Sequence, residues 1–342
     1  MAAGERTLIL AEGFSSDPHH GKTMRGVLRY RGEDVVAIVD SARAGERHAG
    51  VPIVATVADA LAFDPQVALV GVATQGGRFP PAWRALLTEC IRNGLTLENG
   101  LHQMLRDDPE LQPLAQTHGV ELRDLRRAPD DLDCPTGANF EVDAQIVLTV
   151  GSDCAIGKMT VSLELDRAAR ARGVASVFVP TGQTGIAIAG WGISVDAVVA
   201  DFIAGAAERL VVEGRVRGGE LLLVEGQGSL VHPAYSGVTL GLLHGSAPHS
   251  LVLCHRAGAT EVEGYPGHPL PGLAELVALH EHSSLPRRRA RVVAVALNTA
   301  GLDDATAAAA VAAASEETGL PAADPVRDGA EPLLDAILAA PV

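Results

Sequence analysis

The second half of the chain contains the sequence Gly151-Ser-Asp-Cys-Ala-Ile-Gly157-Lys158-Met159-Thr160, from which its fold can be inferred. It follows the apolar run Ile146 to Val150, which predicts a strand, and it leads into a helical pattern from Lys158 to about Arg172 that Gly173 ends. A glycine-rich turn between a strand and a helix presents consecutive backbone N–H groups to an anion, and a lysine adds positive charge. The stretch therefore predicts a phosphate-binding loop.

This loop departs from the usual phosphate-binding pattern at two positions. Five residues separate Gly151 from Gly157 instead of four, and Met159 stands where Ser or Thr normally binds Mg²⁺, with Thr160 one position later. A tight strand-to-helix turn without a ligand is the alternative interpretation. We expect cofactor phosphates to be bound by the loop residues Gly151, Ser152, Cys154, Ala155, Ile156, Gly157, Lys158, Met159 and Thr160.

Two further strand ends strengthen this prediction. The run Leu221 to Glu225 predicts a strand that ends in an acidic residue, and phosphate-binding domains place such a residue near Mg²⁺ or near the attacking group. If the ligand is Mg-ATP, Thr160 and Glu225 would bind the metal. Asn298 follows the predicted strand Val292 to Leu297, where its amide either reads an adenine edge or caps a turn.

Short apolar runs alternate with helical patterns along most of the chain, which predicts an α/β fold with parallel sheets covered by helices. We expect an N-terminal Rossmann-like domain over residues 1–125, a polar connection over 126–143 and a C-terminal P-loop NTPase-like parallel-sheet domain over 144–342. The remaining predicted strands are Thr7 to Leu10, Val35 to Val39, Ile53 to Val54, Val67 to Val72, Ala175 to Val179 and Ser250 to Cys254, and the remaining helices are Pro80 to Asn93 and Asp304 to Thr318.

Composition excludes several classes of protein. The 342 residues carry a formal net charge of −15, which opposes binding to nucleic acid and to anionic membranes. No apolar run approaches the roughly 20 residues of a membrane span, and the N-terminus lacks the pattern of a signal peptide. The four cysteines form no CxxC pair, so neither a disulfide framework nor a zinc knuckle is indicated. We expect a cytoplasmic protein.

Several motifs together resemble a known family. The loop, the Val-Glu-Gly segment and Asn298-Thr299 resemble dethiobiotin synthetase and related P-loop enzymes. More closely, the chain resembles the family known as domain of unknown function 1611, in the runs Asp17 to Lys22, Thr181 to Gly185, Ala189 to Asp196, Ala200 to Phe202 and Val224 to Pro233. This resemblance implies D-glutamate N-acetyltransferase activity, in which acetyl-CoA donates an acetyl group to the amine of D-glutamate.

Acetyl transfer needs a base and donors for the oxyanion. Either Glu225 or His232 would serve as the base, and Asp153 would orient Lys158, hold the substrate amine or cap the helix. A lone histidine or a strand-end acid can instead be structural. We expect the acceptor amino acid to be bound by Gln183, Thr184, Gly226, Gln227 and Arg256, the arginine pairing with a carboxylate.

Two other functions remain open at this point. An ATP-dependent carboxylate-activating ligase or kinase of the dethiobiotin synthetase kind would require ATP and Mg²⁺. A non-catalytic nucleotide-binding protein would bind its ligand without turnover. The sequence does not decide whether the loop binds CoA or ATP. From the resemblance we also expect a homo-oligomer.

Overall fold

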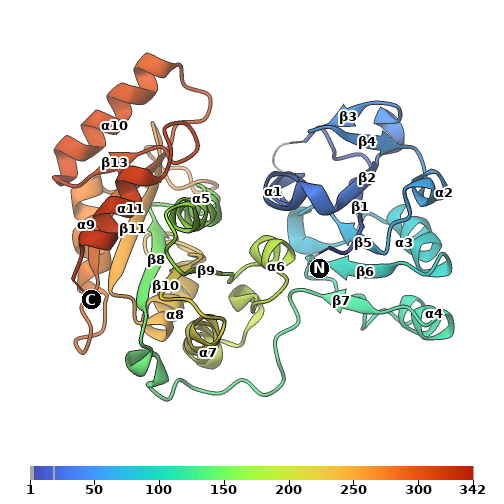
Figure 1. Ribbon diagram of the computed structural model, residues 1–342, viewed down its shortest axis with the longest axis horizontal. Coiled ribbons are helices and arrows are strands. Elements are labelled where there is room, and N and C mark those ends of the chain that lie inside the picture. Colours follow the sequence, from blue (N-terminus) through green and yellow to red (C-terminus); the bar gives the residue numbers. More distant parts are fainter. Residues whose placement is uncertain (1–3, 18–19, 342) are drawn as a thin grey trace. The chain divides into compact units, whose positions relative to one another are not determined.

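The computed structural model describes residues 4–17 and 20–341 (Figure 1). Pro18 and His19, in the stretch Asp17 to Lys22, lie outside the described residues. The chain forms two compact units: the first is Met1–Ala128 with Gln183–Ala197, and the second is Pro129–Gly182 with Val198–Val342. This division differs from the expected domains in the segment 183–197, which lies in the first unit.

The first unit is built on a seven-stranded sheet with the order β3-β4-β2-β1-β5-β6-β7. All neighbouring strands are parallel except β3 and β4, and β1 pairs with both β2 and β5, as in a doubly wound fold. The elements are β1 (Thr7–Leu10), α1 (Lys22–Arg31), β2 (Val35–Val39), β3 (Arg47–His48), β4 (Val51–Val54), α2 (Val57–Ala60), β5 (Val67–Val70), α3 (Trp83–Arg92), β6 (Thr96–Asn99), α4 (Leu111–His118), β7 (Leu122–Asp124) and α6 (Gln183–Ala189).

Helix α6 belongs to the first unit because it packs on α1. The hydroxyls of Thr23 and Thr184 are 3.1 Å apart, and the Arg31 guanidinium donates to the Ala187 carbonyl at 3.3 Å. Farther along the segment, Arg126 forms an ion pair with Asp196. These contacts join residues more than 60 positions apart, so no local sequence pattern reveals them.

The second unit contains a six-stranded parallel sheet with the order β13-β12-β11-β8-β10-β9. Strand β8 is central and buried on both faces, which its apolar sequence QIVLTVG explains. The elements are β8 (Gln145–Gly151), α5 (Lys158–Ala171), β9 (Ser176–Val179), α7 (Ile203–Val216), β10 (Leu221–Val224), α8 (Ser236–Ser246), β11 (Ser250–Arg256), α9 (Leu273–His282), β12 (Arg291–Asn298), α10 (Asp304–Thr318), β13 (Ala322–Ala323) and α11 (Glu331–Ala339).

Helices cover both faces of this second sheet (Figure 1). Helices α5 and α11 pack on one face, while α7, α8 and α9 contact β10, β8 and β12 from the other. Because β8 pairs with β11 on one side and β10 on the other, the chain leaves β8 at the point where the strand order reverses. Ligands bind at such positions in open α/β sheets.

The predicted elements agree closely with the observed ones where apolar runs are distinct. The strands Thr7–Leu10 and Val35–Val39 and the helix Asp304–Thr318 have the predicted bounds, and the others differ by a few residues. Strands β3, β6, β7 and β13 were not predicted, nor were several helices, among them α6, α7 and α8. Among the described residues, no helix combines the length and apolar character that crossing a membrane requires.

We predict that a methyl group at the α7–α8 crossing destabilises the second unit. A Cβ at Gly245 would lie 2.1 Å from the Ala204 carbonyl oxygen, so Gly245→Ala must push α8 away from α7. We expect the free energy of unfolding to fall by about 1–3 kcal/mol in urea titrations. The control is Gly237→Ala on the same helix, which meets nothing within 4 Å and should gain roughly 1 kcal/mol. Equal effects at both positions would contradict the close packing.

Candidate functional site

The loop between β8 and α5, residues 151–160, has the backbone of an anion-binding turn. The Ser152 N–H donates to the Cys254 carbonyl at 3.0 Å, which anchors the loop to β11. Ala155 has φ of 53° and Gly157 has φ of 112°, so the chain reverses through left-handed conformations before the helix begins. Left-handed residues in such a turn direct successive N–H groups toward one point.

These N–H groups are available to a ligand. Within the described part of the chain, the backbone N–H groups of residues 155–160 donate to no other residue. The Asn298 amide donates to the Ile156 carbonyl at 3.2 Å and steadies the loop from the end of β12. A row of N–H groups at a helix N-terminus is complementary to a carboxylate or a phosphate.

Lys158 supplies a buried positive charge at the same place. The residue is only 6% exposed, and its ammonium donates to the Asp153 backbone carbonyl oxygen at 2.6 Å. Burial lowers the pKa of Lys158, while the nearby Cys154, Asp153 and Glu225 groups oppose that decrease. The lysine is thus held by the backbone of its own loop and surrounded by acidic groups.

Asp153 connects the loop to a second segment that the sequence analysis did not identify. One carboxylate oxygen accepts the Cys154 N–H at 2.7 Å, and the other accepts the Glu263 N–H at 2.7 Å. Glu263 lies in a hairpin, residues 260–270, that is closed by a bridge between Glu261 and Pro269. The carboxylate therefore fastens this hairpin to the loop, whereas the Lys158 ammonium is contacted by the Asp153 backbone carbonyl.

Glu225 lies at the end of β10, next to the loop, as the sequence predicted for a strand-end acid. Its Oε2 atom accepts the N–H groups of Thr181 at 2.9 Å and Gly182 at 3.1 Å. Thr181 also donates its hydroxyl proton to the Glu225 carbonyl at 2.6 Å, and Gln227 donates to the Thr181 hydroxyl at 3.3 Å. Glu225 is 4% exposed, and the two N–H groups hold its carboxylate in one orientation.

Gly226 lies where the ends of β8 and β10 meet. Its N–H donates to Thr149 Oγ1 at 2.9 Å. A Cβ at this position would lie 1.7 Å from the Thr149 carbonyl oxygen, so only glycine fits. The glycine is therefore needed to bring Glu225 close to the loop. This structural role is additional to the role in substrate binding predicted for Gly226.

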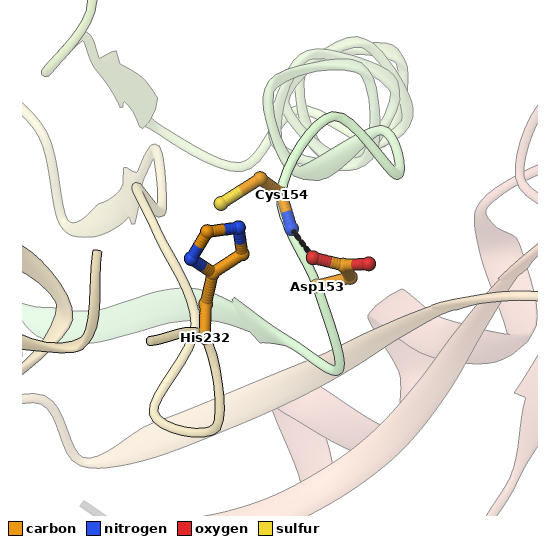
Figure 2. Close-up of side chains that lie close together, drawn as sticks. All are labelled: Asp153, Cys154 and His232. Carbon is orange, nitrogen blue, oxygen red and sulfur yellow. Dashed lines mark hydrogen bonds between the residues drawn. The ribbon is translucent and has the colours of Figure 1, made fainter. Parts of the chain in front are cut away.

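His232 completes the site from the segment after β10. Its Nδ1 accepts the Ala234 N–H at 3.1 Å, so the neutral ring carries its proton on Nε2. The ligand-type atoms of Asp153, Cys154 and His232 lie within 4.8 Å of one another. Figure 2 shows the Cys154 sulfur and the His232 imidazole side by side, next to the Asp153 carboxylate.

Two aromatic rings enclose His232. The Tyr235 ring centroid is 4.6 Å away, and the Tyr265 ring centroid from the 260–270 hairpin is 5.1 Å away. The chain contains only three tyrosines, and two of them lie beside this one histidine. The sequence shows that aromatic residues are few, but it does not show which of them lie together, so this cluster was not predicted.

The cluster of Asp153, Cys154 and His232 has the residue types of a metal site, but its hydrogen bonds do not favour one. A metal needs an imidazole nitrogen with a free lone pair, and in this geometry the proton is on Nε2 while Nδ1 already accepts a backbone N–H. We therefore do not interpret this cluster as a metal site.

The other predicted residues lie at three places. Thr160 is half-buried in the first turn of α5, one residue after Met159. Arg256 ends β11 and lies 3.6 Å from Glu263 in a half-exposed ion pair. Gln183 and Thr184 begin α6 and belong to the first unit.

Family comparisons describe both halves of the chain. The sequence model described as "Domain of unknown function (DUF1611_C) P-loop domain" matches residues 133–334, and the one described as "Domain of unknown function (DUF1611_N) Rossmann-like domain" matches residues 32–128. A crystal structure of a DUF1611 family protein from Anabaena variabilis is 42% identical, with a TM-score of 0.90 over 98% of this chain and 99% of that chain. The predicted fold class is confirmed.

Two curated relatives carry the name D-glutamate N-acetyltransferase. The protein from Tritonibacter scottomollicae is 38% identical over 286 residues, which are 83% of this chain and 84% of the relative. The protein from a Pseudoalteromonas species is 35% identical over 280 residues, which are 82% of this chain and 83% of the relative.

We predict that Thr149→Val weakens the meeting point of β8 and β10. The substitution keeps the shape of the side chain but leaves the buried Gly226 N–H without its acceptor. The free energy of unfolding should fall by about 1–3 kcal/mol. Ser162→Ala, which removes a hydroxyl 3.1 Å from Thr149 Oγ1 and orphans no backbone N–H, is the control and should cost less. A neutral Thr149→Val would argue against the importance of this contact.

We also predict that Asp153→Asn loosens the 260–270 hairpin. The amide replaces one acceptor oxygen with an NH₂ donor, which faces either the Cys154 N–H or the Glu263 N–H. Hydrogen exchange followed by mass spectrometry should show faster exchange over residues 260–270. Glu263→Ala keeps the backbone N–H and loses only the ion pair with Arg256, so its exchange should remain slow. Unchanged exchange in Asp153→Asn would disprove the fastening role.

Proposed function

We propose that this chain, which belongs to the DUF1611 family as its motifs predicted, is an N-acetyltransferase that transfers acetyl from acetyl-CoA to the amine of D-glutamate or a similar amino acid. The observation that carries the proposal is the name shared by two relatives that align over four-fifths of both chains, across both domains. The buried groups around Lys158 support it chemically, because they include the donors and the acceptor that acyl transfer needs.

In this reaction the amine nitrogen forms a bond with the acetyl carbon while the bond from that carbon to the CoA sulfur breaks. The nitrogen must lose a proton, and the leaving sulfur must gain one. Glu225 is our choice for the base, because its carboxylate is buried and fixed by Thr181 and Gly182 beside the loop. It would take the proton from nitrogen and return it to sulfur.

His232 suits a different role from the one considered in the sequence analysis. Because Nδ1 accepts the Ala234 N–H, the ring offers a donor at Nε2 and no free lone pair for a proton. An N–H donor stabilises the oxygen of the acetyl group as it becomes negatively charged. We therefore assign His232 as an oxyanion donor and leave the base role to Glu225.

The ATP-dependent ligase or kinase remains a second candidate because the C-terminal family is described as a P-loop domain. The position of Glu225 at the strand next to the loop also fits a Mg²⁺-binding acid. This candidate is weakened by Met159, which stands where a Ser or Thr hydroxyl normally binds Mg²⁺. The nearest hydroxyl, that of Thr160, is one position later.

We predict that purified protein with D-glutamate and acetyl-CoA forms N-acetyl-D-glutamate and free CoA without ATP, as measured by mass spectrometry. Glu225→Gln should lower kcat by about 10²-fold or more, because the base is lost while the shape is kept. The control for a loss of surface charge is Arg291→Met, at the start of β12 and away from the end that carries Asn298. This variant should retain wild-type activity. Formation of ADP from ATP, with no acetylated product from acetyl-CoA, would support the ligase and refute the acetyltransferase. Binding without any turnover would refute both.

A further inference from the structure

We propose that the 151–160 loop binds the amino-acid acceptor, with a carboxylate of that substrate on the loop N–H groups and its amine beside Asp153 and Glu225, and that the phosphates of CoA bind elsewhere. This inference rests on the proposed acetyl transfer. It replaces the expectation that the loop holds the cofactor phosphates. The argument depends on the balance of buried charge, the free donors and the position of His232.

The balance of buried charge at the loop does not suit a polyphosphate. Among the described residues of the second unit, Lys158 is the one buried lysine or arginine, whereas Asp153 and Glu225 are two buried carboxylates. Both carboxylates act electrostatically on Lys158. Phosphate-binding loops that carry an acidic neighbour offset it with Mg²⁺ held by a hydroxyl after the lysine, and Met159 occupies that position here. A ligand that carries one cation and one anion matches these groups better.

The loop offers separate places for the two charges of an amino acid. The N–H groups of residues 155–160 and the Lys158 ammonium are donors for a carboxylate. Each Asp153 oxygen accepts one backbone N–H, and a carboxylate oxygen has a second lone pair to offer an ammonium group. Asp153 is 1% exposed, so a substrate amine placed there is shielded from water, which strengthens the contact.

His232 indicates where the acetyl group must arrive. The residue is 4% exposed, and among the described residues its Nε2 has no hydrogen-bond partner. One of its ring nitrogens lies within 4.8 Å of the ligand-type atoms of Asp153 and Cys154. Figure 2 shows the ring edge facing the loop. In CoA the long pantetheine arm separates the phosphates from the thioester. A loop that held the phosphates would therefore keep the acetyl carbon away from this donor, and productive transfer requires the reacting atoms to be adjacent.

The test measures the binding of each substrate separately by isothermal titration calorimetry, with D-glutamate and with CoA as the probes. D-glutamate is titrated into the protein alone and into the protein saturated with CoA, so that an ordered mechanism is also covered. We expect Lys158→Met to weaken D-glutamate binding about tenfold or more and to change CoA binding less than twofold. Arg291→Met removes an exposed charge and should change neither affinity.

A second variant tests the place of the amine. The hydroxy analogue of D-glutamate, in which a hydroxyl replaces the amine, should bind wild type more weakly than D-glutamate does. In Asp153→Asn this preference should fall at least fivefold, because the charged partner of the amine is gone. Circular dichroism of each variant verifies that it is folded. If one of the two variants does not fold, the other still tests the proposal.

The outcomes separate this inference from the proposed function. Loss of CoA binding in Lys158→Met with D-glutamate binding unchanged would overturn the inference and assign the loop to the phosphates. The same holds if wild type forms N-acetyl-D-glutamate and Asp153→Asn keeps the full preference for the amine. Absence of any acetylated product from wild type would instead refute the acetyltransferase proposal, and the assignment of the loop with it.

Discussion

The hydrogen bond from the Gly226 N–H to Thr149 Oγ1 fixes how closely the ends of β8 and β10 approach, and the site depends on that approach. The backbone at Gly226 lies so near the Thr149 carbonyl that no side chain fits between them. This contact places the start of the loop and the Glu225 carboxylate side by side at one edge of the sheet. Lys158 then extends from the first turn of α5 across the same edge, with its Cδ near Gly226.

The charged groups gathered at this edge are costly to bury and are compensated by backbone N–H groups. Glu225 accepts two N–H groups, and Asp153 also accepts two, one of them from a hairpin more than 100 positions later in the chain. An isolated buried carboxylate is unstable unless such donors replace water. The arrangement therefore keeps two carboxylates and one ammonium ready in a place from which water is largely excluded, which is what selective binding of a small zwitterion needs.

The sequence predicted the parts of this site that follow one another along the chain. Strand β8, the loop and α5 form a continuous pattern, and Glu225 ends an apolar run, so both were found from local periodicity. The pairing of Cys154 with His232 was not predicted, because 78 positions separate them and the contact depends on how β10 and its following segment are placed. Glu263 was missed for another reason: it contributes a backbone N–H, which no residue type identifies. The grouping of the segment around α6 with the first unit was not predicted, because its partners, such as Arg31, lie far away in sequence.

That segment limits how the gene can be divided. A fragment that starts at residue 129 encodes the whole P-loop sheet but also carries α6, whose Ile186 and Ile188 are buried in the intact chain. Separated from α1, these side chains would be more exposed to water, which favours aggregation. The complementary fragment ending at residue 128 lacks a helix that covers α1. A chimera of two relatives joined at this boundary would therefore pack α6 of one relative against α1 of the other.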